Sequence, residues 1–448
     1  MNRIAFTIAS FALVAAAAFA KAPVARAVAQ TYTPLFETAS PLQFGQLFSA
    51  GIADKRVLVG TRPLVWSPQG RPPQPGVFNL YYFPAYSFHG RLFPQYDIAW
   101  LYDQHPDWIM YRNDRSTIVD NGRVTNPIVD VQNPAVFSFI VSLIESRYEG
   151  FQGVALDNVT PYNAFEQAGH YAGTHTPCVP ASRPACGGTW VQEYRGNRYN
   201  DPAWSTALYN LVQRYRATFA QTGRPILPNV ANPNNSNLGV LICKSAGGCL
   251  EEAWPENGCT TIPNNRLNGK YVDKVWQTRY MQAVSVSWWF APAYLCGHGA
   301  SGITQDEISW NSANWLLEAV NLHTAYFSAD MKGAKTFANY PASMNPPVGP
   351  YSDAPPSPES CGGTGVGTDR GVCVRKYYSN PDRTVVNGII VVNSSGENRQ
   401  NYLVPTSTAG WTDQFCERIP TGNYALAPAT AVVLVSANAD GSCRARLR

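Results

Sequence analysis

Short apolar runs alternate with longer amphipathic stretches along the first three quarters of the chain. Runs rich in aromatic and β-branched residues predict buried strands. They lie at Arg56–Val59, Val77–Phe83, Tyr96–Tyr102, Trp108–Tyr111, Pro127–Val131, Gly150–Val159, Arg224–Val230, Gly248–Trp254, Val284–Phe290 and Ala334–Ala338. Helical spacing follows several of them, with start signals at Asn133-Pro134, Asp201-Pro202 and Thr304-x-x-Glu307. About eight strands interleaved with helices predict a (β/α)8 TIM barrel over residues 30–345.

An open, doubly wound sheet is the other common arrangement of alternating strands and helices. It is less favoured, because the chain has neither a G-x-G-x-x-G nor a P-loop motif. The pattern changes after Tyr340. Residues 346–369 are rich in Pro, Gly and Ser and predict a linker or long loop. Strand patterns alone follow in residues 370–448, so we expect a small C-terminal antiparallel β-sandwich. Its strands are predicted at Val372–Tyr378, Gly388–Asn393, Asn401–Val404 and Ala431–Val435.

The first 29 residues have the parts of a secretory signal peptide. A basic start is followed by an apolar run over Ile4–Ala17 and by small residues suited to cleavage between Ala20 and Ala29. The sequence therefore predicts a secreted or periplasmic bacterial protein with no membrane span. Cleavage after Ala29 lowers the formal charge from +4 by three, to +1. No basic surface for nucleic acid is expected.

Ten cysteines, an even number, fit a disulfide framework in an oxidising compartment. Their spacing suggests the pairs Cys178–Cys186, Cys243–Cys249, Cys361–Cys373, Cys259–Cys296 and Cys416–Cys443. The chain has no C-x-x-C motif or histidine cluster, so no metal site is expected. His170 and His175 are interpreted as solvated residues of a long loop over residues 163–200. No organic cofactor is expected either.

Two carboxyl sites stand at predicted strand ends, where parallel barrels place their chemistry. Asp157 ends the fourth strand, and Glu251 ends a strand two positions further on, with Glu252 beside it. Hydrolysis of a glycosidic bond needs one ionised carboxylate and one protonated carboxylic acid. We assign Asp157 as nucleophile or base and Glu251 as general acid. Adjacent strand residues point to opposite faces, so Glu252 is the alternative acid.

Several further residues are candidates for binding the substrate or supporting the pair. Asn158, Asp130 and Asn229 could hold Asp157 ionised by hydrogen bonding, although Asp130 could equally be a salt-bridge partner. An aromatic lid from Trp254 would favour a protonated acid at residue 251 by desolvation. The rings of Trp254, Trp288 and Tyr81 could stack on sugars, and the competing interpretation for each is a core side chain.

Four short segments resemble a group of bacterial TIM-barrel glycoside hydrolases, which are similar also to endo-polygalactosaminidase and α-galactosidase-type barrels. They are His105–Ile109, Val129–Pro134, Gly153–Asn158 and Leu250–Glu252. The resemblance covers residues ~55–340, and the C-terminal module is similar to the sandwich that often follows such barrels. It implies a nucleophile at Asp157 and an acid/base at Glu251. The chain departs from the pattern in carrying an acidic pair where one Glu is usual.

The sequence therefore predicts a secreted glycoside hydrolase that cleaves a polysaccharide or oligosaccharide with two carboxyl groups. A second hypothesis is a catalytically inactive carbohydrate-binding or surface barrel. A third, a non-glycosidic esterase, is disfavoured by the absence of G-x-S-x-G. The expected partner is a carbohydrate, not nucleic acid. The sugar, its linkage, the stereochemical outcome and the oligomeric state are left open by the sequence.

Overall fold

The computed structural model divides the chain into two compact units, Met1–Pro34 and Leu35–Arg448. The described residues all belong to the second unit. They are residues 43–47, 64–66, 73, 78–88, 93–120, 127–163, 165–177, 186–231, 233, 237–252, 254, 269–284, 289–294, 304–319, 325–328, 348–356, 371–396 and 399–444. The predicted signal peptide, the predicted strands Arg56–Val59 and Ala334–Ala338, and Trp288 lie outside them.

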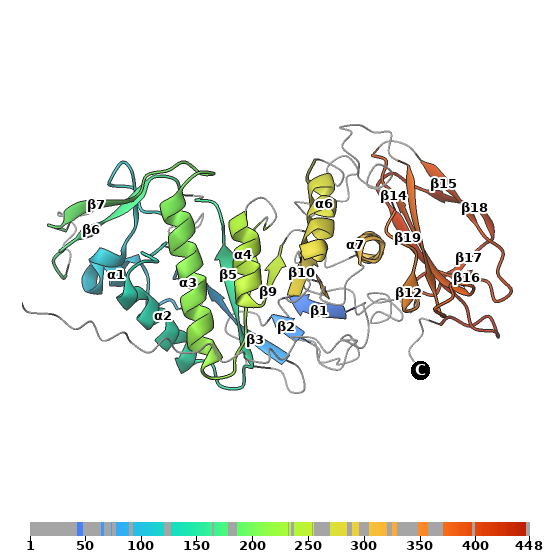
Figure 1. Ribbon diagram of the computed structural model, residues 1–448, viewed down its shortest axis with the longest axis horizontal. Coiled ribbons are helices and arrows are strands. Elements are labelled where there is room, and N and C mark those ends of the chain that lie inside the picture. Colours follow the sequence, from blue (N-terminus) through green and yellow to red (C-terminus); the bar gives the residue numbers. More distant parts are fainter. Residues whose placement is uncertain are drawn as a thin grey trace, which may run out of the picture. The chain divides into compact units, whose positions relative to one another are not determined.

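Eight parallel strands form the larger part of this unit (Figure 1). They are β1 (Gln43–Leu47), β2 (Leu64–Trp66), β3 (Phe78–Pro84), β5 (Gly153–Val159), β8 (Ile226–Val230), β9 (Gly248–Glu251), β10 (Trp289–Tyr294) and β11 (Ala325–Ser328). They pair in the order β1-β11-β10-β9-β8-β5-β3-β2. Strand β2 pairs in turn with β1, so the order returns to the strand at which it began. Asp157 lies on the fourth of these strands along the chain, and Glu251 on the sixth, as the sequence predicted.

From β3 onward, helices lie between consecutive parallel strands in the described part of the chain. They are α1 (Ile98–Gln104), α2 (Pro134–Ser146), α3 (Pro202–Ala220), α4 (Asn237–Ala246), α6 (Gly269–Val284) and α7 (Gln305–Glu318), with a 3-10 turn, η2, at Pro106–Trp108. The three predicted start signals are confirmed. Asn133 and Asp201 cap α2 and α3 through their side chains, each followed by a proline. Thr304 and Glu307 form the capping box of α7.

The prediction of a strand at Tyr96–Tyr102 is wrong, because this segment forms most of helix α1. The Asp97 side chain accepts a hydrogen bond from the Trp100 backbone N–H and so starts the helix. The aromatic residues that suggested a strand pack instead on α2, where Trp100 stacks on Phe139 with ring centroids 5.2 Å apart. Tertiary packing therefore overrides the strand propensity of this segment.

Two loops that follow parallel strands join into a small accessory sheet. Residues 85–133, after β3, carry β4 (Tyr111–Arg112), and residues 160–201, after β5, carry β6 (Ala168–Ala172) and β7 (Thr189–Tyr194). These strands pair antiparallel in the order β4-β6-β7, and Figure 1 shows β6 and β7 side by side. The predicted loop over residues 163–200 thus contains a hairpin, and His170 lies in its first strand.

The C-terminal part is antiparallel, as predicted. A six-stranded sheet has the order β12-β13-β14-β19-β16-β17, and β15 pairs with β18. The strands are β12 (Tyr351–Ser352), β13 (Val372–Tyr378), β14 (Val386–Asn393), β15 (Gln400–Val404), β16 (Trp411–Thr412), β17 (Arg418–Ile419), β18 (Gly422–Leu426) and β19 (Ala431–Ser436). Ile389 and Val391 pack toward β15 and β18, whereas Ile390 and Val392 pack toward α7. The central strand is therefore buried on both faces.

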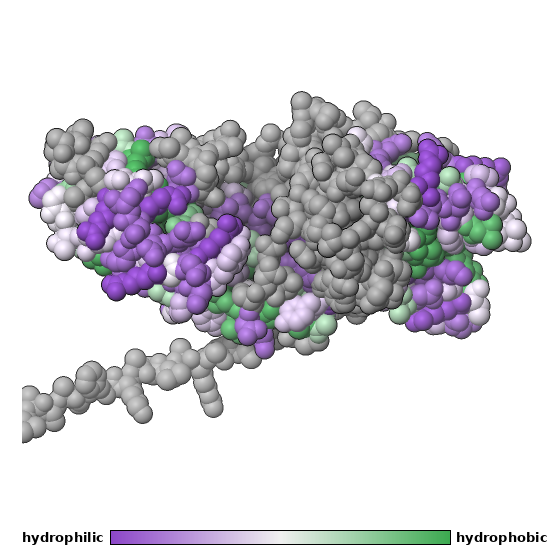
Figure 2. Space-filling view, turned by 90° about the horizontal axis from the view of Figure 1, so that it is seen from above, coloured by the Kyte–Doolittle hydropathy of each residue, from purple (hydrophilic) through white to green (hydrophobic). Residues whose placement is uncertain are grey.

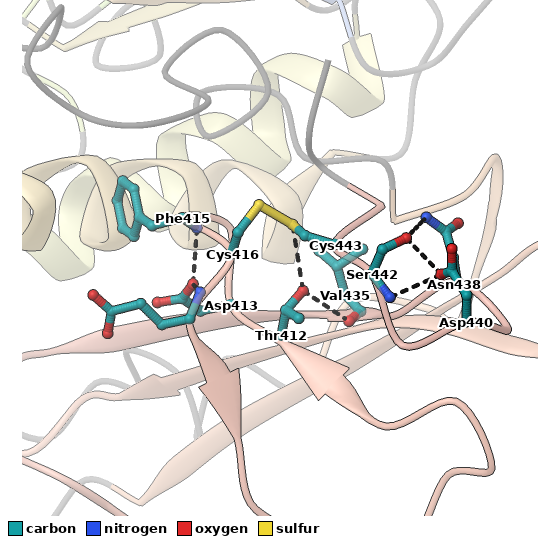
Figure 3. Close-up of a disulfide and its surroundings, with 10 residues drawn as sticks. Thr412, Asp413, Phe415, Cys416, Val435, Asn438, Asp440, Ser442 and Cys443 are labelled. Atoms are coloured by element: carbon teal, nitrogen blue, oxygen red, sulfur yellow. Dashed lines mark hydrogen bonds between the residues drawn. A yellow bond between two sulfur atoms is a disulfide. The ribbon is translucent and has the colours of Figure 1, made fainter. Parts of the chain in front are cut away.

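Two of the predicted disulfides are present. Cys243 bonds to Cys249, joining α4 to β9, and Cys416 bonds to Cys443 within the C-terminal part. Figure 3 shows the second bond beside Thr412, whose hydroxyl lies 3.8 Å from the Cys443 sulfur. Cys186 and Cys373 are also disulfide-bonded, and their predicted partners Cys178 and Cys361 lie outside the described residues.

The described surface mixes hydrophilic and hydrophobic residues. In the view of Figure 2 the hydrophobic ones form small separate areas. Large exposed apolar side chains are scattered along the chain, for example Leu241, Val385 and Leu403, and single side chains of this kind are ordinary. Among the described helices, none combines the length and the apolar character needed to cross a membrane.

Candidate active site

Asp157 lies near the C-terminal end of β5, and its side chain faces β3 and β8. Strand pairing sets Ala155 opposite Tyr82 on β3, and side chains two residues apart share a face. Tyr82 and Asp157 are therefore on the same side of the sheet. The Tyr82 hydroxyl donates to Oδ2 of Asp157 at 2.5 Å. The aspartate side chain is buried.

The other oxygen of Asp157 receives two hydrogen bonds. The Asn229 amide on β8 donates from Nδ2 to Oδ1 at 2.9 Å, and the backbone N–H of Asn158 donates to the same oxygen at 2.8 Å. An ionised carboxylate only accepts hydrogen bonds, so the three donors match that form. They also fix the orientation of the group. The sequence hypothesis expected Asn158 and Asn229 to hydrogen-bond Asp157, and both do.

The Asn158 contact depends on a local distortion of β5. Asn158 has a φ of +63°, and the pairing with β8 shifts register between Leu156 and Val159. Asn is one of the few residues other than Gly that adopts this backbone region readily. The bulge turns the Asn158 N–H back toward the carboxylate of the preceding residue, as bulges beside active sites re-aim groups.

Glu251 and Glu252 leave β9 on opposite sides. Leu250 pairs with Asn229, so Glu252, two residues later, shares the face of Asn229 and Asp157. Glu251 points the other way. Its carboxylate is buried and forms an ion pair with Nζ of Lys274 on helix α6. The helix that follows β9 thus supplies the cation that compensates this buried charge.

Glu252 is mostly buried and lies in a setting that favours its protonated form. Burial, together with the Asp157 carboxylate, raises its pKa to about 8, and a hydrogen bond with Asn229 opposes the rise. The Asn229 side chain therefore contacts both carboxyl groups. Two carboxyl groups in opposite protonation states around one amide can supply a base and an acid to the same substrate.

The remaining sequence candidates lie elsewhere. Tyr81 is edge-on to Phe151, with ring centroids 5.1 Å apart, on the opposite face of β3 from Tyr82. Trp254 is fully buried and packs edge-on against Trp315 of α7, so it offers no exposed face to a sugar. Asp130 is buried in a separate cluster with two residues of the accessory sheet.

Sequence reasoning missed Tyr82, Tyr86 and Lys274. Burial and the Asp157 carboxylate raise the pKa of Tyr86, and the N–H of the preceding Ala85 donates to the Asp157 carbonyl at 2.9 Å, so this segment runs beside the site. Tyr82 lies in an aromatic run that is buried on both faces, so its pattern does not reveal which ring points toward β5. The sequence shows that Leu250 and Glu252, two residues apart, share a face of the strand. Only the pairing of Leu250 with Asn229 shows that this face is the one that carries Asp157.

No protein-family model and no curated protein matches the chain. Solved structures similar to it include the GH36 α-galactosidase AgaA of Geobacillus stearothermophilus, at 10% identity and a TM-score of 0.35 over 81% of this chain and 45% of that one. The galactosidase domain of an α-galactosidase-sucrose kinase is 10% identical, with a TM-score of 0.36 over 80% of this chain and 44% of that one. An α-amylase of Geobacillus thermoleovorans is 10% identical, with a TM-score of 0.40 over 88% of this chain and 97% of that one. The chain spans less than half the length of the α-galactosidases, and these likenesses are too distant to assign a role to any residue.

Proposed function

We propose that this protein is a secreted glycoside hydrolase with a (β/α)8 barrel, and that Asp157 and Glu252 are its catalytic pair. The observation that carries the proposal is the shared Asn229, which contacts an aspartate surrounded by donors and a glutamate that burial keeps protonated. Two carboxyl groups in different protonation states are what cleavage of a glycosidic bond requires. The disulfides are consistent with secretion.

Asp157 is the nucleophile or base, and Glu252 is the general acid that protonates the leaving oxygen. Glu251 was the first choice for the acid from sequence, with Glu252 as the alternative. The ion pair of Glu251 with Lys274 favours the alternative, because a carboxylate held by a buried ammonium is a poor proton donor. Glu251 then orients β9 against α6. The substrate is a polysaccharide or oligosaccharide.

The shared amide also bears on stereochemistry. Two hydrogen bonds to one amide hold the two carboxyl groups close together. Retaining glycosidases separate them by about 5–5.5 Å and inverting ones by about 6.5–9.5 Å. We therefore propose net retention, with a covalent glycosyl intermediate on Asp157. Proton NMR of the first product formed, before its anomers interconvert, checks this expectation.

The first experiment incubates the purified protein with a panel of bacterial exopolysaccharides and plant glycans and measures new reducing ends. Asp157→Asn should lower turnover by several orders of magnitude, because it removes the ionised group that attacks or activates water. Asp103→Asn, an exposed site on α1, is the matched control and should be unchanged. Wild-type protein that cleaves no glycan yet binds one would favour the inactive carbohydrate-binding barrel instead.

The second experiment separates the two glutamates. Glu252→Gln should lose turnover on natural glycans but keep activity on substrates whose leaving group needs no protonation. Glu251→Gln should leave Lys274 as a buried uncompensated charge and cost about 3–5 kcal/mol of folding stability, with the acid step intact in the folded fraction. If Glu251→Gln alone shows the leaving-group rescue, the assignment of the acid returns to Glu251.

A further inference from the structure

A second cluster of ionisable side chains lies in the accessory sheet, apart from the proposed catalytic pair. Asp130, His170 and Glu193 each offer one ligand atom, and these atoms lie within 4.8 Å of one another. Asp130 is 4% exposed, and the side chains of His170 and Glu193 are 16% and 11% exposed. Three ionisable groups rarely gather under such cover without a partner that compensates them.

The strand pairing explains how the three residues meet. His170 on β6 faces Val191 on β7, and Glu193 lies two residues beyond Val191, so His170 and Glu193 are near neighbours across the hairpin. The pairing shifts register between Ala168 and Gly169, which makes Glu193 the extra residue of a bulge. Bulges of this kind re-aim a side chain and are frequent at functional sites.

Asp130 reaches the hairpin from the other loop. Its backbone N–H donates to the Trp108 carbonyl at 3.1 Å, and its Oδ1 accepts from the Gln132 N–H at 2.8 Å. Val129, the residue before it, donates to the Tyr86 carbonyl at 3.1 Å. The cluster therefore joins the hairpin to the segment that carries Tyr86, and Ala85 of that segment donates its N–H to the Asp157 carbonyl at 2.9 Å.

Hydrogen bonds do not satisfy the cluster. Nδ1 of His170 and Oε2 of Glu193 are buried atoms without a hydrogen-bond partner. Nδ1 of His170 and Oε1 of Glu193 are 3.7 Å apart, too far for a good hydrogen bond. Ligand atoms about 2.1 Å from a tetrahedral cation stand at roughly this separation from each other. A cation site requires buried ligand atoms that lack hydrogen-bond partners and lie at such distances from one another.

We propose that Asp130, His170 and Glu193 bind a divalent transition-metal ion of the Zn²⁺ type, which pins the β6–β7 hairpin to the loop after β3. One imidazole and two carboxylates suit Zn²⁺, whereas Ca²⁺ takes six to eight oxygen ligands. The site is independent of the proposed glycosidase activity. Its role is to hold the β6–β7 hairpin against the loop after β3, which contacts the C-terminal end of β5.

Without a cation, the same cluster has to hold protons. A bound metal ion displaces such protons, so cation and protons compete for the site.

The test uses the whole purified protein, stripped with a chelator and dialysed against Zn²⁺, Mn²⁺ or Ca²⁺ separately. Metal content by mass spectrometry and thermal unfolding are the readouts, and neither depends on activity. We expect about one Zn²⁺ per chain and a rise of several degrees in Tm, since a ligand of the folded state stabilises it. Ca²⁺ should have little effect. If none of the three ions is retained or raises the Tm of the wild-type protein, the proposal is overturned.

Two variants locate the ion. His170→Asn and Glu193→Gln should each weaken Zn²⁺ binding by at least about 100-fold, because even residues that only orient ligands change affinity by 10–100-fold. His175→Asn, an exposed histidine in the same hairpin, is the matched control and should bind as the wild type does. Equal binding by all three variants would show that the ion sits elsewhere and would refute the site. The wild-type arms decide the outcome even if a variant fails to fold.

Discussion

The Asp157 carboxyl group accepts three hydrogen bonds. The donors are the Tyr82 hydroxyl on β3, the backbone N–H of Asn158, and the Asn229 side-chain amide on β8. None of these donors is charged. These three donors therefore hold the carboxyl group in place by hydrogen bonding alone. Each donor fixes the orientation of the Asp157 carboxyl group, so the loss of any one of them should weaken the site.

Tyr82→Phe removes one of these donors without changing the shape of the ring. Loss of a hydrogen bond to a charged group costs about 1.5–3 kcal/mol, so we expect kcat/KM to fall by roughly 10–150-fold. Tyr81→Phe is the matched control, since its ring faces Phe151 on the other side of β3, and should leave kcat/KM unchanged. Equal losses in the two variants would mean that the hydroxyl of Tyr82 has no special part in the reaction.

Glu252 sets the expected pH dependence. Burial and the charge of Asp157 raise its pKa to about 8, so the side chain keeps its proton at neutral pH and loses it as the pH rises through that value. A general acid works only while protonated, and kcat/KM should therefore decline on the alkaline side, near pH 8. The pH profile of the wild-type enzyme measures this limb.

The same profile in Glu252→Gln, recorded on a substrate with a good leaving group, provides the control. Glutamine does not titrate, so the alkaline limb should disappear. An alkaline limb that survives the substitution would belong to a different group, and the acid role of Glu252 would then be wrong.

Helix α7 shows how one element joins the two parts of the chain. It lies between the parallel strands and the C-terminal sheet, and its residues are buried on nearly every side. Arg375 on β13 donates from Nη1 to the carbonyls of Leu316, Leu317 and Ala319, each at 2.9 Å. These are carbonyls of the last turn, which have no partner within the helix. The C-terminal sheet therefore supplies the cap of this helix.

Arg375→Met should remove the donor to the carbonyls of Leu317 and Ala319, at about 1–3 kcal/mol for each group that finds no substitute, whereas the Leu316 carbonyl still accepts from the Tyr377 hydroxyl. We expect the midpoint of urea unfolding to fall clearly. Lys376→Met, an exposed neighbour on the same strand, should change it little. Similar midpoints for both variants would show that the cap contributes nothing to stability.

At the scale of the whole molecule, two loops that are separate in sequence become one structure. The loops after β3 and β5 pair as β4-β6-β7, above the strand ends that carry Tyr82 and Asp157. Asp130 reaches His170 and Glu193 only through this pairing. No local spacing motif could have revealed the cluster, because its members lie in three segments of the chain. The sequence hypothesis of no metal site rested on such motifs.

The strands β3, β5, β8 and β9, three helix starts, two disulfides and the placement of carboxyl groups at strand ends could be predicted from sequence, whereas β1, β2 and β11 were not. These features depend on residues close together in the chain: caps, prolines, apolar runs and near cysteines. The choice between Glu251 and Glu252, between Tyr81 and Tyr82, and between strand and helix at Tyr96–Tyr102 needed the tertiary structure. In a strand that is buried on both faces, the pattern is apolar throughout and does not mark the side that meets the substrate. That side is fixed by the register with neighbouring strands and by the partner side chain that another element supplies, as α6 supplies Lys274 to Glu251.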